Sequence, residues 1–143
     1  MKKWIFTDVC DRLKQQVPAL RWIDAQEGQL STNERPAVAF PCCLIDMAYI
    51  RCETLSGGKQ KVTVQISLQV SFQSFAQTNA NAPVQVRDKA LERLDVMEEI
   101  HAALGWWGNN MKFTPMMRKR VTAEKRVDGL KVFNAVYETV FLD

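Results

Sequence analysis

The sequence lacks the residue patterns on which most catalytic sites are built. It contains a single histidine, His101, which lies among acidic and small residues of an expected helix and is therefore expected to be solvent-exposed. The cysteines Cys10, Cys42, Cys43 and Cys52 include no C-x-x-C pair, so they offer no spacing for a tetrahedral zinc site. Cys42 and Cys43 also fall in the most apolar stretch, which favours small buried hydrophobes over a thiol nucleophile. We therefore expect a non-enzymatic protein with no catalytic residue, metal or cofactor.

Long apolar runs and a strong excess of one charge are also missing. No window approaches 18 uninterrupted apolar residues, so no membrane span is expected. The 19 basic and 16 acidic residues give a net charge of +3, which is too small to indicate nucleic-acid binding by itself. The N-terminus has the charge of a signal peptide, but acidic and basic residues interrupt any apolar region. We expect a cytoplasmic location.

The clearest pattern that is present is a strict alternation over residues 62–72. Apolar side chains occupy every second position, and successive strand side chains point to opposite faces, so one face of this strand is built for a core. The other face is uncharged and hydrogen-bonding. Gln65, Ser67 and Gln69 on this face are candidates for a surface that is exposed to solvent in the free chain and buried in an assembly.

The flanking sequence predicts an α+β fold. Residues 3–17 and 86–104 carry apolar side chains at the three- and four-residue steps of amphipathic helices. A short strand is expected within residues 20–30, and a strand beginning near Cys42 is joined through a turn at residues 55–59 to the alternating strand, forming a long antiparallel hairpin. Two further strands are expected in residues 113–143, around the turn Asp128-Gly129. We expect one domain over residues 1–143, an antiparallel sheet with both helices packed on one face.

The strongest charged feature is the basic cluster Arg118, Lys119 and Arg120, followed by Lys125 and Arg126. On a strand, Arg118 and Arg120 are expected to share one face with Arg126, giving a positive stripe that could meet phosphate or an acidic protein surface. The alternative is an edge strand that its charges protect from aggregation.

Two adjacent tryptophans, Trp106 and Trp107, follow the second helix. They could form a stacking platform for a ligand or an anchor for a partner. Capping the open end of the core is the more frequent use of such residues.

The order and length of these elements resemble those of the tail-terminator or tail-completion proteins of long-tailed bacteriophages, most of all the lambda type. The similarity lies in the amphipathic first helix, the stretch Arg35-Pro36-Ala37-Val38 that runs through Phe40-Pro41 into a strand, the turn at residues 55–59, the long alternating strand, the second helix, and a strand pair ending at Leu142-Asp143. The Cys42-Cys43 pair, the Trp106-Trp107 pair and a basic rather than acidic penultimate strand depart from the family.

The resemblance implies a structural phage or prophage protein without enzymatic activity. Six copies would close a ring that caps the tail tube, ends its polymerisation and presents a surface to the head. Its partners would be other copies of itself, the tail tube protein and a head-completion or neck protein, first in the host cytoplasm and then in the virion tail. The alternative that the residues leave open is a small α+β module that binds nucleic acid or protein through residues 118–126.

Overall fold

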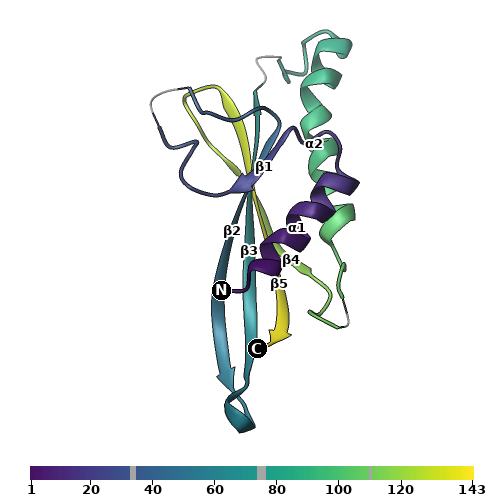
Figure 1. The fold of residues 1–143 in the computed structure, drawn as a ribbon. Coiled ribbons are helices and arrows are strands. Elements are labelled where there is room, and N and C mark those ends of the chain that lie inside the picture. Colours follow the sequence, from purple (N-terminus) through teal and green to yellow (C-terminus); the bar gives the residue numbers. More distant parts are fainter. Residues whose placement is uncertain (33–34, 74–76, 110) are drawn as a thin grey trace.

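The chain folds into one mixed β-sheet with two helices on the same side. The computed structural model describes residues 1–32, 35–73, 77–109 and 111–143. Its elements are α1 (Lys3–Gln16), β1 (Trp22–Ala25), β2 (Cys42–Thr54), the short 3-10 helix η1 (Ser56–Gly58), β3 (Gln60–Gln73), α2 (Val84–Leu104), β4 (Met117–Glu124) and β5 (Leu130–Leu142). The predicted α+β fold is confirmed, and Figure 1 shows α1 and α2 beside each other along the sheet.

The five strands lie in the order β1-β2-β3-β5-β4. The neighbours β2 and β3, β3 and β5, and β5 and β4 are antiparallel. The first strand differs from the antiparallel expectation, because β1 pairs with β2 in parallel, Trp22 beside Cys42 and Ala25 beside Ile45. Residues 26–41 are long enough to carry the chain back to the starting end of β1, as a parallel pair requires.

The predicted hairpin of β2 and β3 is the longest feature of the sheet. It is paired from Cys42 opposite Ser71 to Thr54 opposite Gln60, with one register shift between Tyr49 and Arg51. The turn uses Gly57 in a left-handed conformation, with φ of 75°, which a side chain would strain. Because β5 pairs with the opposite side of β3 over nearly its whole length, β3 is the central strand.

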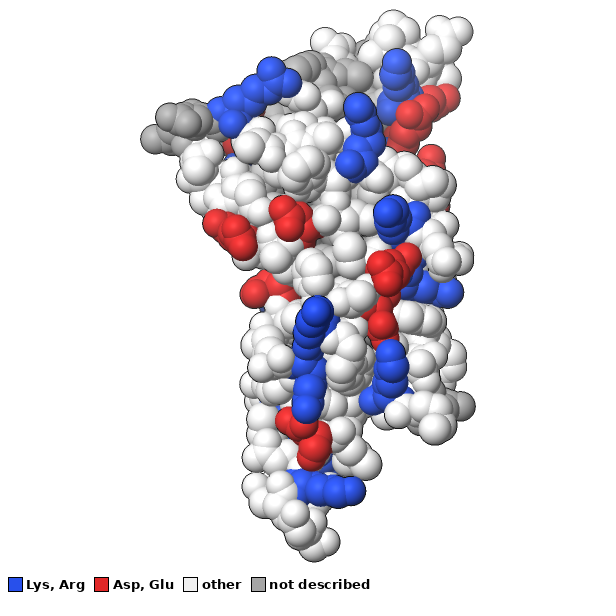
Figure 2. All heavy atoms as spheres, viewed as in Figure 1, with Lys and Arg blue, Asp and Glu red and all other residues white. Residues whose placement is uncertain are grey.

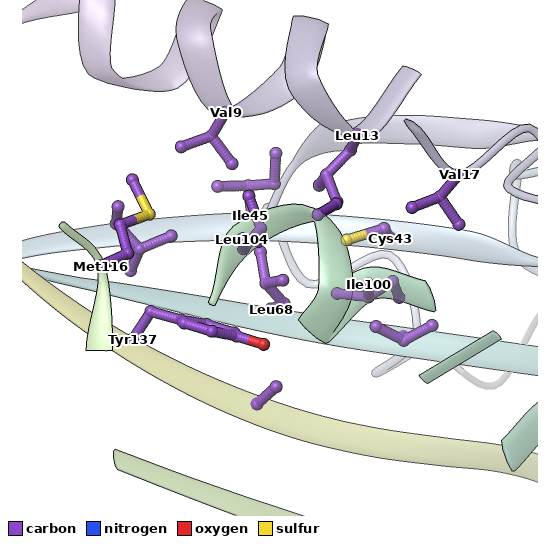
Figure 3. Close-up of a cluster of buried hydrophobic side chains, with 14 of the residues drawn as sticks. Val9, Leu13, Val17, Cys43, Ile45, Leu68, Ile100, Leu104, Met116 and Tyr137 are labelled. Atoms are coloured by element: carbon purple, nitrogen blue, oxygen red, sulfur yellow. The ribbon is translucent and has the colours of Figure 1, made fainter. Parts of the chain in front are cut away.

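The main core lies between the sheet and the two helices. All six apolar residues of the alternating strand are buried there, as the alternation predicts; they are Val62, Val64, Ile66, Leu68, Val70 and Phe72. Figure 3 shows Val9 and Leu13 of α1 and Ile100 and Leu104 of α2 pointing toward Leu68 of this strand. The helix-facing side of the sheet is therefore closed.

The opposite, helix-free face is covered at one end only. Leu30 packs there on Cys42, Leu44 and Val132 in a second small cluster, with partly buried side chains of the 26–41 segment around it. The remaining part of this face carries the half-buried Gln65 and Ser67. The sheet thus has one closed face and one partly open face.

Candidate interaction surfaces

The polar residues of β3 fall into two environments on the helix-free face. Gln69 accepts a hydrogen bond from the Gln26 side chain and donates one to Glu124 Oε1 at 3.4 Å, so it belongs to the covered end. Gln65 instead donates to Ser67 Oγ at 3.2 Å, and both lie on the open part of the face. Of these three predicted surface residues, the structure therefore leaves Gln65 and Ser67 on an open face.

The basic residues of β4 lie on an outer strand of the sheet. Seven of its eight residues, from Met117 to Ala123, are exposed. Arg118 pairs with Tyr137 and Arg120 with Val136, with a register shift between them. Because directly opposed residues share a face and Tyr137 and Val136 are adjacent, Arg118 and Arg120 point to opposite faces. The single-face stripe predicted from strict alternation is wrong here, since the extra residue Lys119 inverts the alternation.

Unlike the other basic residues of this region, Arg126 uses its side chain for several bonds within the chain. Its guanidinium lies 2.7 Å from Glu124 Oε2 and 2.6 Å from Asp128 Oδ2, and it also donates to the Leu30 carbonyl oxygen. The hydrogen bonds from Arg126 lower the pKa of both carboxyl groups, and those bonds in turn raise the pKa of Arg126. Arg126 therefore joins the turn before β5 to the segment that covers the helix-free face.

The remaining cations of this region differ in their partners. Lys119 Nζ lies 3.6 Å from Glu138 Oε2, a long and solvent-exposed ion pair. Within the described residues Arg118, Arg120 and Lys125 form no ion pair, and all three are exposed. The positive charges of Arg120 and Lys125 thus remain available to a partner, as does that of Arg118, whose side chain lies beside the Tyr137 hydroxyl.

The two tryptophans have opposite environments. The Trp107 ring packs edge-on against Phe113 with 5.1 Å between centroids, and the Arg12 guanidinium lies 5.4 Å above it. Trp106 is 74% exposed and has a positive φ of 59°, which is uncommon for a residue with a bulky side chain. Trp107 caps the core, whereas Trp106 is available for contact. Adjacency in sequence could not separate the two roles.

A shallow groove of about 410 Å³ lies beside Trp106. It is lined by residues that end α2 and begin β4, including His101, Met116 and Arg118. Met117, at the start of β4, also lines it and is half exposed. An exposed indole beside a flexible thioether and a guanidinium has the composition that protein interfaces favour.

The groups with potential catalytic chemistry are largely sequestered. Cys42 and Cys43 are fully buried, and burial raises the pKa of the Cys42 thiol to about 11 and that of Cys43 further. His101, expected to be solvent-exposed, is half-buried because α2 packs over β5, and its Nδ1 lies 3.1 Å from the Tyr137 hydroxyl. Burial raises the pKa of Tyr137 to about 12. The raised pKa values keep the side chains of Cys42, Cys43 and Tyr137 protonated at neutral pH.

Other kinds of site were also sought in the described part of the chain. No group of three or more His, Cys, Asp or Glu side chains there could hold a metal ion. Among its helices, none has the length and apolar character needed to cross a membrane. A hollow of about 750 Å³ lies between the segment near Leu30 and the turn near Arg126, and charged side chains already bonded to each other line part of it.

The fold and its surfaces define an α+β protein with a half-open sheet, open sheet edges and an exposed tryptophan. No protein-family model and no curated protein matches the sequence.

Proposed function

We propose that this chain is a structural assembly protein of phage or prophage tails, a tail terminator or tail-completion protein. Copies of it form a ring on the end of the tail tube, stop tube polymerisation and offer a surface for joining the head. The order of elements resembles that family, and the α+β architecture agrees with it. The observation that carries the proposal is the helix-free face, which is covered at one end and open around Gln65 and Ser67.

A ring requires two different contact patches on each subunit, because each copy meets one neighbour on either side. The sheet supplies unlike surfaces for this purpose: a polar open face, a basic outer strand β4 and the exposed Trp106. By resemblance the ring has six members. In this proposal the protein works by assembly and performs no chemical step.

The test measures the mass of the assembled protein and its binding to tail tubes. Light scattering coupled to size-exclusion chromatography should show a concentration-dependent species of six 16.4-kDa chains. Added to polymerising tail tube protein from the same phage, the chain should bind tube ends and shorten the tubes seen by electron microscopy. A chain that stays monomeric and never binds tubes contradicts the proposal.

A second function is favoured by the available cations at Arg118, Arg120 and Lys125, which could contact nucleic-acid phosphates. Affinity for duplex DNA should then fall steeply between low and moderate salt, because phosphate contacts release counterions. Arg126 would contribute little, since its guanidinium is occupied by Glu124 and Asp128. Binding that is absent at low salt would exclude this function.

A further inference from the structure

The sheet has an open edge on each side. β1 and β4 are its outermost strands. β1 covers only the first four residues of β2, so residues 46–54 of β2 have no strand partner on that side among the described residues. Open edges present unpaired backbone N–H and C=O groups that another strand can bind. On β1 the backbone N–H and C=O of Ala25 are already bonded to the Asp24 and Gln29 side chains, so β4 and residues 46–54 of β2 are the stretches that can extend the sheet.

The two edges carry opposite charge near the level of β1, whereas farther along β2 Arg51 is paired with Glu53. On the β4 side lie Arg118, Arg120 and Lys125, which form no ion pair within the described residues. On the β1 side lie Asp24, Glu27 and Asp46, and these carboxylates likewise have no cationic partner in the described part of the chain. Figure 2 shows acidic side chains gathered over β1 and the adjoining part of β2. Contact between unlike edges is therefore attractive, whereas contact between like edges is repulsive.

The charges also occupy matching levels of the sheet. Asp46 is opposite Ser67, Ser67 is opposite Val136, and Val136 is opposite Arg120. These paired residues share one face, so Asp46 and Arg120 lie at the same level on the helix-free side. When the two edges meet without a shift along the strands, these two charges meet.

The strand directions suit such a contact. β4 runs opposite to β5, β5 opposite to β3, and β3 opposite to β2 and its parallel neighbour β1. β4 and β1 therefore run in opposite directions. If two copies lie side by side in the same orientation, β4 of one copy runs antiparallel to β1 of the next. Antiparallel pairing is slightly more stable per residue than parallel pairing.

Apolar side chains lie beside the charges on both edges. On β4, Met117 is 50% and Val121 41% exposed, and on β1 Trp22 is 39% exposed. A groove of about 510 Å³ runs between α1 and β1, lined by Cys10, Trp22 and Asp24 among others. Lys14 and Arg21 line this groove as well, so the negative charge is concentrated on the helix-free side, at Asp24 and Asp46.

We propose that the basic β4 edge of one copy docks on the acidic β1–β2 edge of the next copy, joining copies head to tail. This contact is heterologous and closes a ring or grows a filament according to the rotation between copies. The inference rests on the proposed ring assembly and assigns its subunit contact. It places Arg120 of one copy near Asp46 of the other.

The test exchanges the charges of the two edges. One variant carries Arg120→Glu and Lys125→Glu, which removes the positive charge that faces the acidic edge; the other carries Asp24→Lys and Asp46→Lys, which makes that edge basic. Each alone should need a concentration about tenfold or more above that of wild type to assemble, because like charges then meet. An equimolar mixture should assemble as wild type does, with the two variants alternating. Masses are measured by light scattering after size exclusion.

Two controls keep the result interpretable. Arg87→Glu reverses a cation near the start of α2, which belongs to neither edge strand, and should assemble normally. If the variant with Arg120→Glu and Lys125→Glu unfolds by circular dichroism, Arg120→Glu alone replaces it, since that side chain is exposed. Assembly of the wild type should also weaken as salt screens the edges.

The outcomes separate this contact from the proposed function. Single variants that assemble like wild type, or a mixture that stays monomeric, overturn the edge contact, and tube capping then remains to be judged by electron microscopy. A wild type that is monomeric up to millimolar concentration also overturns it. Rescue in the mixture without any binding to tail tubes would support the contact and contradict the tail-terminator role.

Discussion

The two adjacent tryptophans of this chain lie in opposite environments. Trp107 packs on Phe113 and under Arg12, whereas Trp106 points into solvent. We expect Trp107→Ala to lower the free energy of unfolding by about 2 kcal/mol, because it removes a partly buried ring. Trp106→Ala should change stability by less than about 0.5 kcal/mol. Urea unfolding measures both, and equal losses would contradict the assignment of a core role to Trp107 alone.

Arg126 is the charged residue with the most internal bonds. Replacing it by methionine keeps much of the apolar stem but removes the bonds to Glu124, Asp128 and the Leu30 carbonyl. We expect a loss of about 1 kcal/mol, reduced by solvent screening of the two half-exposed carboxylates. Arg118→Met is the matched control, because Arg118 is exposed and lies on the same edge of the sheet. A similar loss in both variants would argue against the bonded cluster.

The same cluster predicts a pH dependence. Hydrogen bonds from Arg126 hold the pKa of Glu124 and of Asp128 below their usual range. A carboxyl group whose pKa is lower in the folded state stabilises the fold fully at any pH above its pKa in the unfolded state, which is about 4. This stabilisation is lost as the pH falls through the pKa of the folded state. Wild type should thus lose more stability between pH 7 and pH 3 than Arg126→Met does. Parallel acid-dependent losses measured by urea unfolding would exclude the linkage.

The four thiols should react in an order set by their burial. Cys52 is exposed, Cys10 is half-buried, and Cys42 and Cys43 are buried. Burial raises the pKa of Cys10, Cys42 and Cys43, which lowers the thiolate fraction of each. At pH 8 an aromatic disulfide reagent should modify Cys52 first and Cys10 more slowly. Cys42 and Cys43 should react only in denaturant, and their rapid reaction in the native protein would contradict this packing.

At the scale of elements, the polar face of β3 has an open part and a covered part. Gln65 lies on the open part, opposite Glu138 of β5, and Gln69 lies under the covering segment, bonded to Gln26 and Glu124. Substitution by lysine adds the same charge at both positions, near a carboxylate in each case. The pair therefore offers a matched test of the open surface.

We expect Gln65→Lys to weaken binding to tail tube ends but not ring assembly, because Gln65 lies on the open face of the central strand and outside both edges. Stability should stay within about 0.5 kcal/mol, because Glu138 can accept the new charge. Gln69→Lys should leave tube binding unchanged but cost about 1 kcal/mol, because the bond from Gln26 is lost. Co-sedimentation with tail tubes and urea unfolding of both variants measure the two effects. If Gln65→Lys binds tube ends as wild type does, the open face takes no part in tube binding.

At the scale of the whole molecule, one core connects both helices to the sheet. Leu13 of α1 and Leu104 of α2 are fully buried in the same cluster as the central strand. We expect Leu13→Ala to lower the free energy of unfolding by about 3 kcal/mol, through lost burial and the cavity it leaves. Helical signal and tryptophan fluorescence should still be lost in one transition. Separate transitions for the two probes would show that α1 unfolds independently.

Local pattern was sufficient to predict the elements and their buried faces. The alternation of residues 62–72, the helical spacing of residues 3–17 and the turn signals at residues 55–59 and at Asp128-Gly129 all correspond to observed elements. Each of these signals depends on a few neighbouring residues, whose side-chain directions follow from backbone geometry alone. The amino-acid sequence by itself therefore determined the α+β class, the long hairpin and the closed face of β3.

Contacts between distant residues were decided only by the tertiary structure. The parallel pairing of β1, the bulge that turns Arg118 and Arg120 to opposite faces, and the bonding of Arg126 to the Leu30 carbonyl each depend on segments far apart in the chain. So does the location of opposite charges on the two sheet edges, with Asp46 level with Arg120 across four strands. Periodicity specifies which side of an element is apolar, but strand order and register follow from the packing of all elements together.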